Sequence, residues 1–446
     1  MTAALNLGPT DYSLLTDLYQ LTMTACYTGE GIEQQPASFE LFTRRLPPDF
    51  GYLIAAGLAQ AVDYLRQWRF GDEQITALQA TGIFAQAPDR FWTLLAGGRF
   101  TGDVWAVPEG TPVFAHEPML RVEAPLWQAQ LAETYLLNVL NYQTLIATRA
   151  ARLRDVAGPT AILLEFGTRR AFSPQGALWA ARAALAGGLD ATSNVLAALR
   201  LGQKPAGTMA HALVMVIATL QDSEDEAFTA FSRYFPDSPL LIDTYDTLAA
   251  TQRLAQQMER GERSLTGVRL DSGDLVELSQ QVRSRLPGVK IFASGDLDEW
   301  EIARLQAADA CLDGYGLGTR LVSGRPVNGV YKLVEIAGQP TMKQSSHKET
   351  YPGRKQVWRQ AAGDRLALAD EAPLPNATPL LVLVMRGGEL CRPLDDLTTI
   401  RQRATAAVAG LPARTRCLTE PEPLSAEISP ALRQLRAELS GDRIPA

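Results

Sequence analysis

The chain has 446 residues, of which 46% are hydrophobic and 20% are charged, and its formal net charge is −7. This balance is that of an ordinary globular protein, and it excludes a mainly disordered, collagen-like or coiled-coil chain. The acidic charge also argues against nucleic-acid binding, which needs clustered positive charge against the phosphate backbone. It does not exclude a small anionic ligand, because such a ligand needs only a local basic pocket.

Four scattered cysteines form no C-x-x-C pair, so no zinc pattern is present, and their sparseness fits a reducing compartment. The N-terminal sequence lacks the basic segment and apolar core of a signal peptide, and apolar runs such as 379–385 are too short to span a bilayer. We therefore expect a cytoplasmic protein with no membrane association. The chain has three histidines, His116, His211 and His347, which is too few for multi-histidine metal chemistry.

The first 155 residues predict a mixture of helices and strands. Helical spacing of apolar residues covers 17–28, 55–68 and 126–150. Residues 37–42 have the pattern of a strand, and residues 99–125 that of short strands and turns. We expect residues 1–155 to form an N-terminal domain of the α+β class.

A regular alternation begins near residue 160, where short apolar runs are separated by amphipathic segments of helical length. Strands that alternate with helices indicate parallel β-α units, as in a β/α barrel or a doubly wound sheet. We expect residues 156–325 to form this domain. The apolar runs are 161–166, 206–210, 240–242, 267–270, 289–293 and 311–315, and the clearest helical segments are 246–259, 274–285 and 297–307.

The alternation stops after residue 325. Residues 329–336 and 380–384 are strand-like, residues 343–359 are polar and basic, and residues 425–440 are polar and helix-prone. We treat residues 326–446 as a separate C-terminal segment.

Each of the six predicted strands ends in a polar cluster. Active sites in β/α barrels and open sheets form at the carboxyl ends of strands, where aspartate and serine also commonly cap the next helix. Six clusters in a row, with arginines and glycines among them, favour one shared site. The clusters are Glu165–Arg170, His211, Asp243–Asp246, Arg269–Asp274, Ser294–Asp296 and Gly316–Arg320.

These clusters predict an anion site. Glycine lets the backbone approach an anion, and helix-start N–H groups point at it, so 294–296 and 316–319 suit a phosphate. Arg269 and Asp271 face the same side of a strand, and they form either a structural ion pair or a site for phosphate, ribose hydroxyls or Mg²⁺. His211 lies at a predicted strand end, which favours a role as nucleophile or proton shuttle over a role in the core.

Along most of its length the chain resembles the nicotinate phosphoribosyltransferase family. The resemblance rests on the order and context of several segments, none of which is specific alone. It implies a type II phosphoribosyltransferase with an α/β fold: an irregular, incomplete β/α barrel and an α+β domain assembled from N- and C-terminal segments, to which 326–446 returns. The segments are 16–23, 165–170, 207–211, 268–274, 293–296, 315–319 and 352–357.

The resemblance also implies the reaction. Phosphoribose passes from 5-phosphoribosyl 1-diphosphate to nicotinate, giving nicotinate mononucleotide and diphosphate in NAD salvage. ATP drives this ligase-type reaction through a phosphohistidine, Mg²⁺ is the cofactor, and a homodimer shares its active sites. Nicotinamide or quinolinate as substrate, or a catalytically silent phosphate-binding barrel, stay open as alternatives, and residues 190–194 lie near the ring site by resemblance.

The resemblance assigns roles residue by residue, with His211 as the phosphorylated histidine. His347 stands in a polar loop where a small or amide residue is expected. The other implied roles are Phe166 and the partner's Tyr19 stacking on the ring, Arg169 on the nicotinate carboxylate or a neighbouring phosphate, Arg269 and Asp271 on the phosphoribosyl group, Gly295, Gly318 and Thr319 around its 5-phosphate, Ser294, Asp296 and Gly316 beside them, Arg354 and Lys355 on diphosphate or ATP, and Asp271 and Asp296 on Mg²⁺.

Overall fold

The computed structural model describes residues 5, 7–343, 350–361 and 363–440, so His347 lies outside the described residues. The chain divides into two compact units. The composite unit contains residues 1–145, 326–396 and 411–446, and the barrel unit contains residues 146–325 and 397–410. The sequence placed the first boundary at residue 155, whereas the structure places it inside a continuous helix. Residues 397–410 belong to the barrel unit and not to the composite unit.

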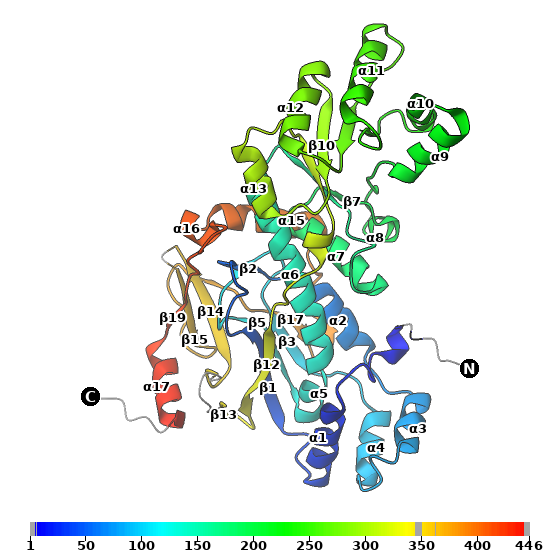
Figure 1. The fold of residues 1–446 in the computed structure, drawn as a ribbon. Coiled ribbons are helices and arrows are strands. Elements are labelled where there is room, and N and C mark those ends of the chain that lie inside the picture. Colours follow the sequence, from blue (N-terminus) through cyan, green and yellow to red (C-terminus); the bar gives the residue numbers. More distant parts are fainter. Residues whose placement is uncertain (1–4, 6, 344–349, 362, 441–446) are drawn as a thin grey trace. The chain divides into compact units, whose positions relative to one another are not determined.

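The composite unit is built from both ends of the chain, as Figure 1 shows by its blue and yellow-to-red strands. Among the described residues, its main sheet has the order β13-β12-β1-β5-β3-β17-β18, and every neighbouring pair is antiparallel. The strands are β1 (Pro36–Thr43), β3 (Asp103–Ala106), β5 (Pro118–Pro125), β12 (Gly329–Ile336), β13 (Gln339–Pro340), β17 (Val382–Arg386) and β18 (Glu389–Leu390).

Strand β1 lies in the middle of this sheet and is buried from Ala37 to Thr43, so both of its faces are covered. A smaller sheet has the order β16-β14-β15-β19, and β2 pairs with β4. The remaining elements of the unit are η1 (Pro9–Asp11), α1 (Leu18–Gly29), β2 (Leu53–Ile54), α2 (Leu58–Gln67), α3 (Asp72–Ala80), α4 (Asp89–Ala96), β4 (Pro112–Val113), α5 (Leu126–Leu131), the first half of α6 (Glu133–Ala157), β14 (Lys355–Gln360), β15 (Gly363–Leu368), β16 (Thr378–Pro379), α16 (Ala413–Arg416), β19 (Glu427–Ile428) and α17 (Pro430–Ser440).

The barrel unit contains a parallel sheet with the order β7-β6-β11-β10-β9-β8 in the described part of the chain. Read as a ring, this is the strand order of a β/α barrel, except that β7 and β8 do not pair. The expected incomplete barrel is therefore confirmed. The strands are β6 (Ile162–Glu165), β7 (Ala191–Thr192), β8 (Leu240–Leu241), β9 (Gly267–Leu270), β10 (Lys290–Ser294) and β11 (Gly314–Leu317).

Helices follow the strands of this sheet, and α11, α12 and α13 lie along its outer side in Figure 1. Helices α9 and α10 pack on each other within the connection from β7 to β8, which spans the gap in the ring. The helices are α7 (Pro174–Gly187), α8 (Val195–Arg200), α9 (His211–Gln221), α10 (Glu224–Tyr234), α11 (Thr247–Glu259), α12 (Leu275–Arg285), α13 (Glu299–Ala307), α14 (Thr319–Val322) and α15 (Leu397–Ala409), which packs on α7.

One predicted strand is wrong. Residues 206–210 have no regular secondary structure, and β7 takes the sheet position expected for them. The segment makes one strand-like hydrogen bond, from the amide of Ala206 to the carbonyl of Thr192 at 2.9 Å. Pro205 has no N–H to offer, and Gly207 has no side chain to pack, so neither supports a longer ladder.

None of the helices in the described ranges is long and apolar enough to cross a membrane.

Candidate active site

The aspartates that follow the strands divide into two groups. Asp246, Asp274 and Asp298 cap helices, because a side-chain oxygen of each accepts backbone N–H groups in the first turn of α11, α12 or α13. The capping explanation is therefore correct for these three. The aspartates directly after the strands are not caps and lie at the edge where the parallel strands end; they are Asp243, Asp271 and Asp296.

Phe166 forms a flat apolar wall at the end of β6. Its ring lies against β11, where a Cβ atom at Gly316 would come within 2.6 Å of two ring carbons. Glycine at this position thus makes room for the ring. The guanidinium carbon of Arg269 lies 6.0 Å from the centre of the same ring. Phe166, Gly316 and Arg269 line a cavity of about 380 Å³.

Glu165 holds the end of β6 in place. Its side chain is 1% exposed, and it accepts hydrogen bonds from the hydroxyl of Thr192 and the amide of Gly167. Burial raises the pKa of Glu165, while these two hydrogen bonds oppose the rise. Glu165 thus joins β6 to β7 and fixes the turn from which Phe166 projects.

Arg269 connects the sheet to the segment before His211. Its Nη1 donates to the Thr208 hydroxyl at 2.8 Å, and its Nη2 donates to the Met209 carbonyl at 3.0 Å. Its Nε is buried and has no partner among the described residues. Burial lowers the pKa of Arg269, the charges of Asp271 and Asp243 raise it, and the charge of Arg169 lowers it. Arg269 thus lines the Phe166 cavity while one of its N–H donors, buried beside the sheet, has no acceptor among the described residues.

His211 is the first residue of α9 and its side chain is 38% exposed. Its Nδ1 lies 3.1 Å from the Thr244 hydroxyl. On the other side of the ring, Nε2 lies 3.9 Å from an oxygen of Asp271 and 4.0 Å from an oxygen of Asp243. The histidine is thus placed between a hydroxyl and two carboxylates.

Asp243 and Thr244 received no separate role in the sequence analysis. The Asp243 side chain is 2% exposed, and its Oδ2 accepts from the Asp271 amide and the Ser272 hydroxyl, both at 2.7 Å. Its Oδ1, the atom that faces His211, is buried without a hydrogen-bond partner among the described residues. The position of Asp243 within two residues of the end of β8 was the available signal, because Asp271 and Asp296 follow their strands at a similar distance.

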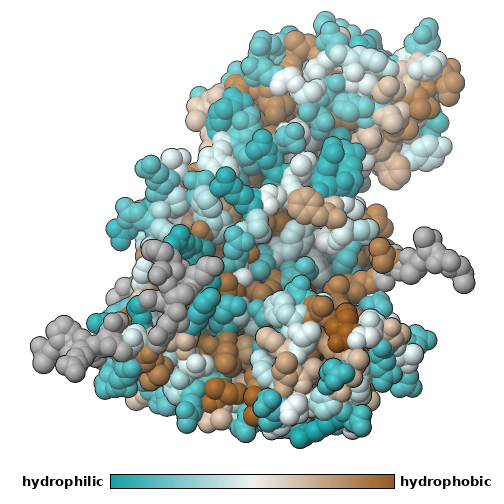
Figure 2. All heavy atoms as spheres, turned by 60° about the horizontal axis from the view of Figure 1, so that its bottom comes forward, coloured by the Kyte–Doolittle hydropathy of each residue, from teal (hydrophilic) through white to brown (hydrophobic). Residues whose placement is uncertain are grey.

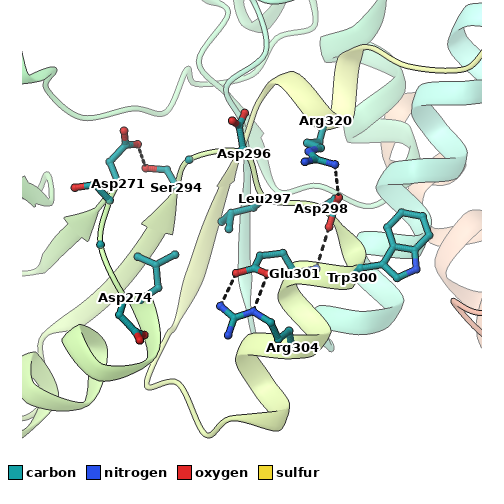
Figure 3. Close-up of a pocket in the computed structure, with 14 residues that line it drawn as sticks. Asp271, Asp274, Ser294, Asp296, Leu297, Asp298, Trp300, Glu301, Arg304 and Arg320 are labelled. Atoms are coloured by element: carbon teal, nitrogen blue, oxygen red, sulfur yellow. Dashed lines mark hydrogen bonds and ion pairs between the residues drawn. The ribbon is translucent and has the colours of Figure 1, made fainter.

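The neighbouring hollow, drawn in Figure 3, has a volume of about 660 Å³ and lies at the ends of β9 and β10. The Ser294 hydroxyl donates to Oδ1 of Asp271. Gly295 has φ +101°, and a Cβ there would lie 2.6 Å from the carbonyl oxygen of Asp271, so only glycine fits without strain. Asp296 also has a left-handed backbone, with φ 46°. Gly318 precedes Thr319, the first residue of α14.

The charges around this hollow favour a cation. Its arginines are already paired: Arg320 with Asp298 at 3.2 Å, and Arg304 with Glu301 at 2.8 and 2.7 Å. The carboxylates of Asp271 and Asp296 have no arginine partner among the described residues. No group of three or more metal-ligating side chains occurs in the described part of the chain. A hard cation would therefore take oxygen ligands from these aspartates together with a substrate or water, as Mg²⁺ commonly does.

Three of the predicted ligands, Tyr19, Arg354 and Lys355, lie in the composite unit. Tyr19 is about half exposed. The burial of the rest of its surface, followed by the charge of Glu133, raises its pKa. Arg354 pairs with Glu335 at 3.1 Å and with Glu123 at 3.4 Å, and keeps a half-exposed side chain. In the barrel unit, Arg169 is exposed and has no partner among the described residues, so it is available to an anion.

Lys355 is buried, with a side chain that is 2% exposed. Its ammonium group pairs with Glu40 at 2.8 Å and donates to the carbonyls of Tyr351 and Gly353, both at 2.7 Å. These contacts use all three of its N–H donors. The geometry therefore argues against the predicted role of Lys355 as a diphosphate ligand and gives it a structural role inside its own unit.

Family models match most of the chain. The N-terminal domain model of nicotinate phosphoribosyltransferase (NAPRTase) matches residues 14–141, the NAPRTase family model residues 162–293, and the C-terminal domain model residues 372–436. Among curated proteins, a nicotinate phosphoribosyltransferase of Mycobacterium tuberculosis is 42% identical over 92% of this chain and 89% of its own length. The human nicotinate phosphoribosyltransferase is 34% identical, over 97% of each chain.

Solved structures agree. The crystal structure of human nicotinic acid phosphoribosyltransferase superimposes with a TM-score of 0.83 at 32% identity, covering 95% of this chain and 99% of that one. A nicotinate-nucleotide pyrophosphorylase from Pyrococcus furiosus gives a TM-score of 0.74 at 27% identity, covering 92% and 99%. The matches in sequence and in fold cover most of the chain, and the chain belongs to the nicotinate phosphoribosyltransferase family.

Proposed function

We propose that this chain is a nicotinate phosphoribosyltransferase that joins nicotinate to the phosphoribosyl group of 5-phosphoribosyl 1-diphosphate, with release of diphosphate, in NAD salvage. The observation that carries the proposal is the grouping at the strand ends. Phe166 and Arg269 line one cavity, Asp271 and Gly295 line the next, and His211 lies beside Asp271. This arrangement offers a ring site, a phosphate site and a histidine in one unit.

The ring site suits a carboxylate better than an amide. Arg269 lines the ring cavity, and the exposed Arg169 has no partner among the described residues, so both are cations that suit a nicotinate carboxylate. A free carboxylate among residues 190–194 would favour an amide substrate over a negatively charged one. Most side chains of this segment already have protein partners: Asp190 pairs with Arg154 at 2.6 Å, Thr192 bonds to Glu165, and Asn194 caps the N-terminus of α8. Ser193 is the neutral residue left beside Gly207.

Charge stabilisation drives the transfer step. As the bond from ribose C1 to diphosphate breaks, positive charge develops on the ribose and negative charge on the leaving group, while the nicotinate nitrogen forms the new bond. The carboxylate of Asp271 lines the hollow, where it would stabilise the ribose, and Gly295 in the same lining would lie at its 5-phosphate. Mg²⁺, when bound through Asp271 and Asp296, would neutralise charge on the diphosphate.

We assign the ATP-dependent step to His211. Two carboxylates near Nε2 favour a proton on that nitrogen, which leaves the lone pair on Nδ1, next to the Thr244 hydroxyl. In the proposed step, the Nδ1 lone pair attacks the γ-phosphorus of ATP, the bond to ADP breaks, and Asp243 stabilises the positive ring or takes its Nε2 proton. Later hydrolysis of the phosphorus–nitrogen bond releases phosphate and restores the histidine.

A homodimer would complete the ring site, because Phe166 covers one face of the ring and the family resemblance assigns the other to the partner's Tyr19. Helix α9, all of which is described, buries one side chain, that of Val214. Apolar side chains gather where α9 and α10 lie at the upper right of Figure 2. They include Met215, Val216, Leu220, Tyr234 and Phe235, each more than half exposed. Exposed apolar patches of this kind mark protein interfaces.

One assay tests the function. The purified chain is given nicotinate, nicotinamide or quinolinate with 5-phosphoribosyl 1-diphosphate and Mg²⁺, each with and without ATP. We expect nicotinate mononucleotide to form fastest and ATP to increase its yield. Turnover with nicotinamide or quinolinate but not with nicotinate would overturn the proposal. Turnover with none of the three substrates would favour a silent phosphate-binding barrel.

The variant Met215→Glu/Val216→Glu tests the dimer by sedimentation, with Ser284→Glu on exposed α12 as the matched control. Two charges on the α9 face should produce monomers with much lower activity, while the control stays dimeric. A fully active monomer would contradict the shared site.

A further inference from the structure

A separate hollow lies in the composite unit beside the C-terminus of α4. Its volume is about 370 Å³, which falls within the range of small-ligand pockets. Its lining residues include Arg90, Arg99, Trp127 and Gln128. None of these residues has a role in the proposed reaction, so this hollow raises a separate question.

The charge of the hollow is opposite to that of the protein. Its titratable lining residues are both arginines, although the chain as a whole carries −7. Arg99 is exposed and has no ion pair or hydrogen bond among the described residues. Arg90 pairs with Glu33, whose side chain is 0% exposed. Since a buried carboxylate is costly without a partner, Glu33 anchors Arg90 at this rim.

Two further lining residues, Gln128 and Trp127, have hydrogen-bond donors without an acceptor among the described residues. Gln128 is 5% exposed, and its Oε1 accepts from the Thr101 amide at 2.8 Å and the Thr101 hydroxyl at 3.2 Å. These bonds fix the amide orientation, and its Nε2 has no acceptor among the described residues. Trp127 is 3% exposed, and its indole N–H is also without an acceptor there. About nine in ten buried polar groups are satisfied in native proteins, so the buried indole N–H without an acceptor is unusual.

We propose that this hollow binds a small organic anion with a flat ring. Its carboxylate or phosphate group would accept hydrogen bonds from Arg90, Arg99 and the Gln128 amide, and its ring would lie against Trp127. Charge-assisted bonds to guanidinium groups are the strongest that such an anion can make at a protein surface. The inference does not depend on the proposed reaction.

Residue-specific protection tests the site. The whole protein is treated with phenylglyoxal, which modifies arginines, and the rates at Arg99 and Arg69 are read separately by peptide mass spectrometry. Arg69 is a matched control, because it is also exposed, in the same unit and outside the hollow. With phenyl phosphate or benzoate at ten times its dissociation constant, the rate at Arg99 should fall about tenfold. The rate at Arg69 should not change.

Three outcomes would overturn the proposal. The first is no protection of Arg99 by phenyl phosphate or benzoate. The second is equal protection by inorganic phosphate, which would remove the need for a ring. The third is protection without ligand that grows with protein concentration, which would mean that a second copy of the chain covers the hollow.

Binding measured by calorimetry supplies a second readout. Arg99→Ala should weaken binding of phenyl phosphate in this hollow about tenfold, since one hydrogen bond to a charged group is lost. Arg69→Ala should leave it unchanged. Arg99→Ala keeps the Arg90–Glu33 pair, so a stable fold is expected, and unchanged affinity in this variant would contradict the proposal.

Discussion

The guanidinium of Arg269 donates to the hydroxyl of Thr208 at 2.8 Å, across 61 positions of the sequence. Thr208 lies three residues before His211, in the segment without regular structure that connects α8 to α9. Strand β9 thereby holds the segment that sets the position of α9. The same guanidinium faces Phe166, so one side chain contacts both the ring wall and the support of the histidine.

Thr208→Val should loosen this support. Loss of one hydrogen bond to a charged group, worth about 1.5–3 kcal/mol, should lower the ATP-dependent formation of phosphohistidine by roughly tenfold or more. The affinity for nicotinate should change much less, because Phe166 and Arg269 remain. Thr208→Ser keeps the hydroxyl and should restore phosphorylation. Equal phosphorylation of the valine and serine variants would show that the bond has no positioning role.

The environment of His211 predicts which nitrogen carries the phosphate. The carboxylates near Nε2 and the hydroxyl near Nδ1 favour the Nδ1-phosphorylated isomer. Phosphorus NMR of the ATP-treated protein distinguishes the two isomers. Asp243→Asn should reduce the yield about tenfold, because the buried charge that stabilises the ring is lost. A product phosphorylated on Nε2 would reverse the proposed proton placement.

Five of the six strands described in the barrel unit could be predicted, because each overlaps a short apolar run that is followed by polar residues, whereas β7 lies in none of these runs. Residues 267–270 agree with β9 residue for residue, and 240–242 differs from β8 by one. The run at 206–210 was wrongly predicted as a strand. Its residues are mostly apolar, but Pro205 and Gly207 do not support the hydrogen-bond ladder of a strand. The spacing of strands indicated a ring, but only hydrogen bonding could show that β7 and β8 leave it open.

The site was predictable where a side chain's role follows from its place on a strand, as for Asp271. It was not predictable where the role depends on a distant partner. Thr208 acquires its role from Arg269, and Lys355 loses its predicted role because Glu40, 315 positions away, holds it inside. Sequence spacing carries no information about such pairs. A family motif therefore identifies a segment of the chain, but it does not show which side chains of that segment contact a ligand.

A pair of buried carboxyl groups predicts a pH dependence of stability in the composite unit. Glu117 is 1% exposed and lies near Asp364, which makes a bidentate ion pair with Arg359 at 2.9 and 2.6 Å. Burial, followed by the charge of Asp364, raises the pKa of Glu117 well above its usual value. At pH values between the unfolded and the folded pKa, Glu117 keeps a proton in the folded state that it has already released in the unfolded chain. The folded state is therefore favoured more at low pH than at high pH.

The contribution of Glu117 to stability should be fully present below its unfolded pKa and should fall as pH rises through its raised folded pKa. Glu117→Gln mimics the protonated acid at every pH. Its melting temperature should equal that of the parent near about pH 5 and exceed it near about pH 8.5. Scanning calorimetry at both pH values measures this difference. An equal difference in melting temperature between the two proteins at both pH values would mean that Glu117 is ionised in the folded state.

The buried pair of Lys355 and Glu40 makes the last prediction. Glu40 is 0% exposed, and besides its ion pair it accepts the backbone N–H of Lys355 at 2.7 Å. Burial lowers the pKa of Lys355, and the charge of Glu40 opposes this. Removing one partner of such a pair leaves an uncompensated charge and should cost about 3–5 kcal/mol of unfolding free energy.

Lys355→Met and Glu40→Gln should each destabilise the protein by this amount in urea denaturation, and the double variant should lose much less than their sum. Arg354→Ala provides the comparison, because its side chain is half-exposed and its stability cost should be below about 1 kcal/mol. If Lys355 instead binds diphosphate, Lys355→Met would leave stability unchanged and raise the KM for 5-phosphoribosyl 1-diphosphate. The two roles thus predict opposite patterns, and stability measured beside kinetics separates them.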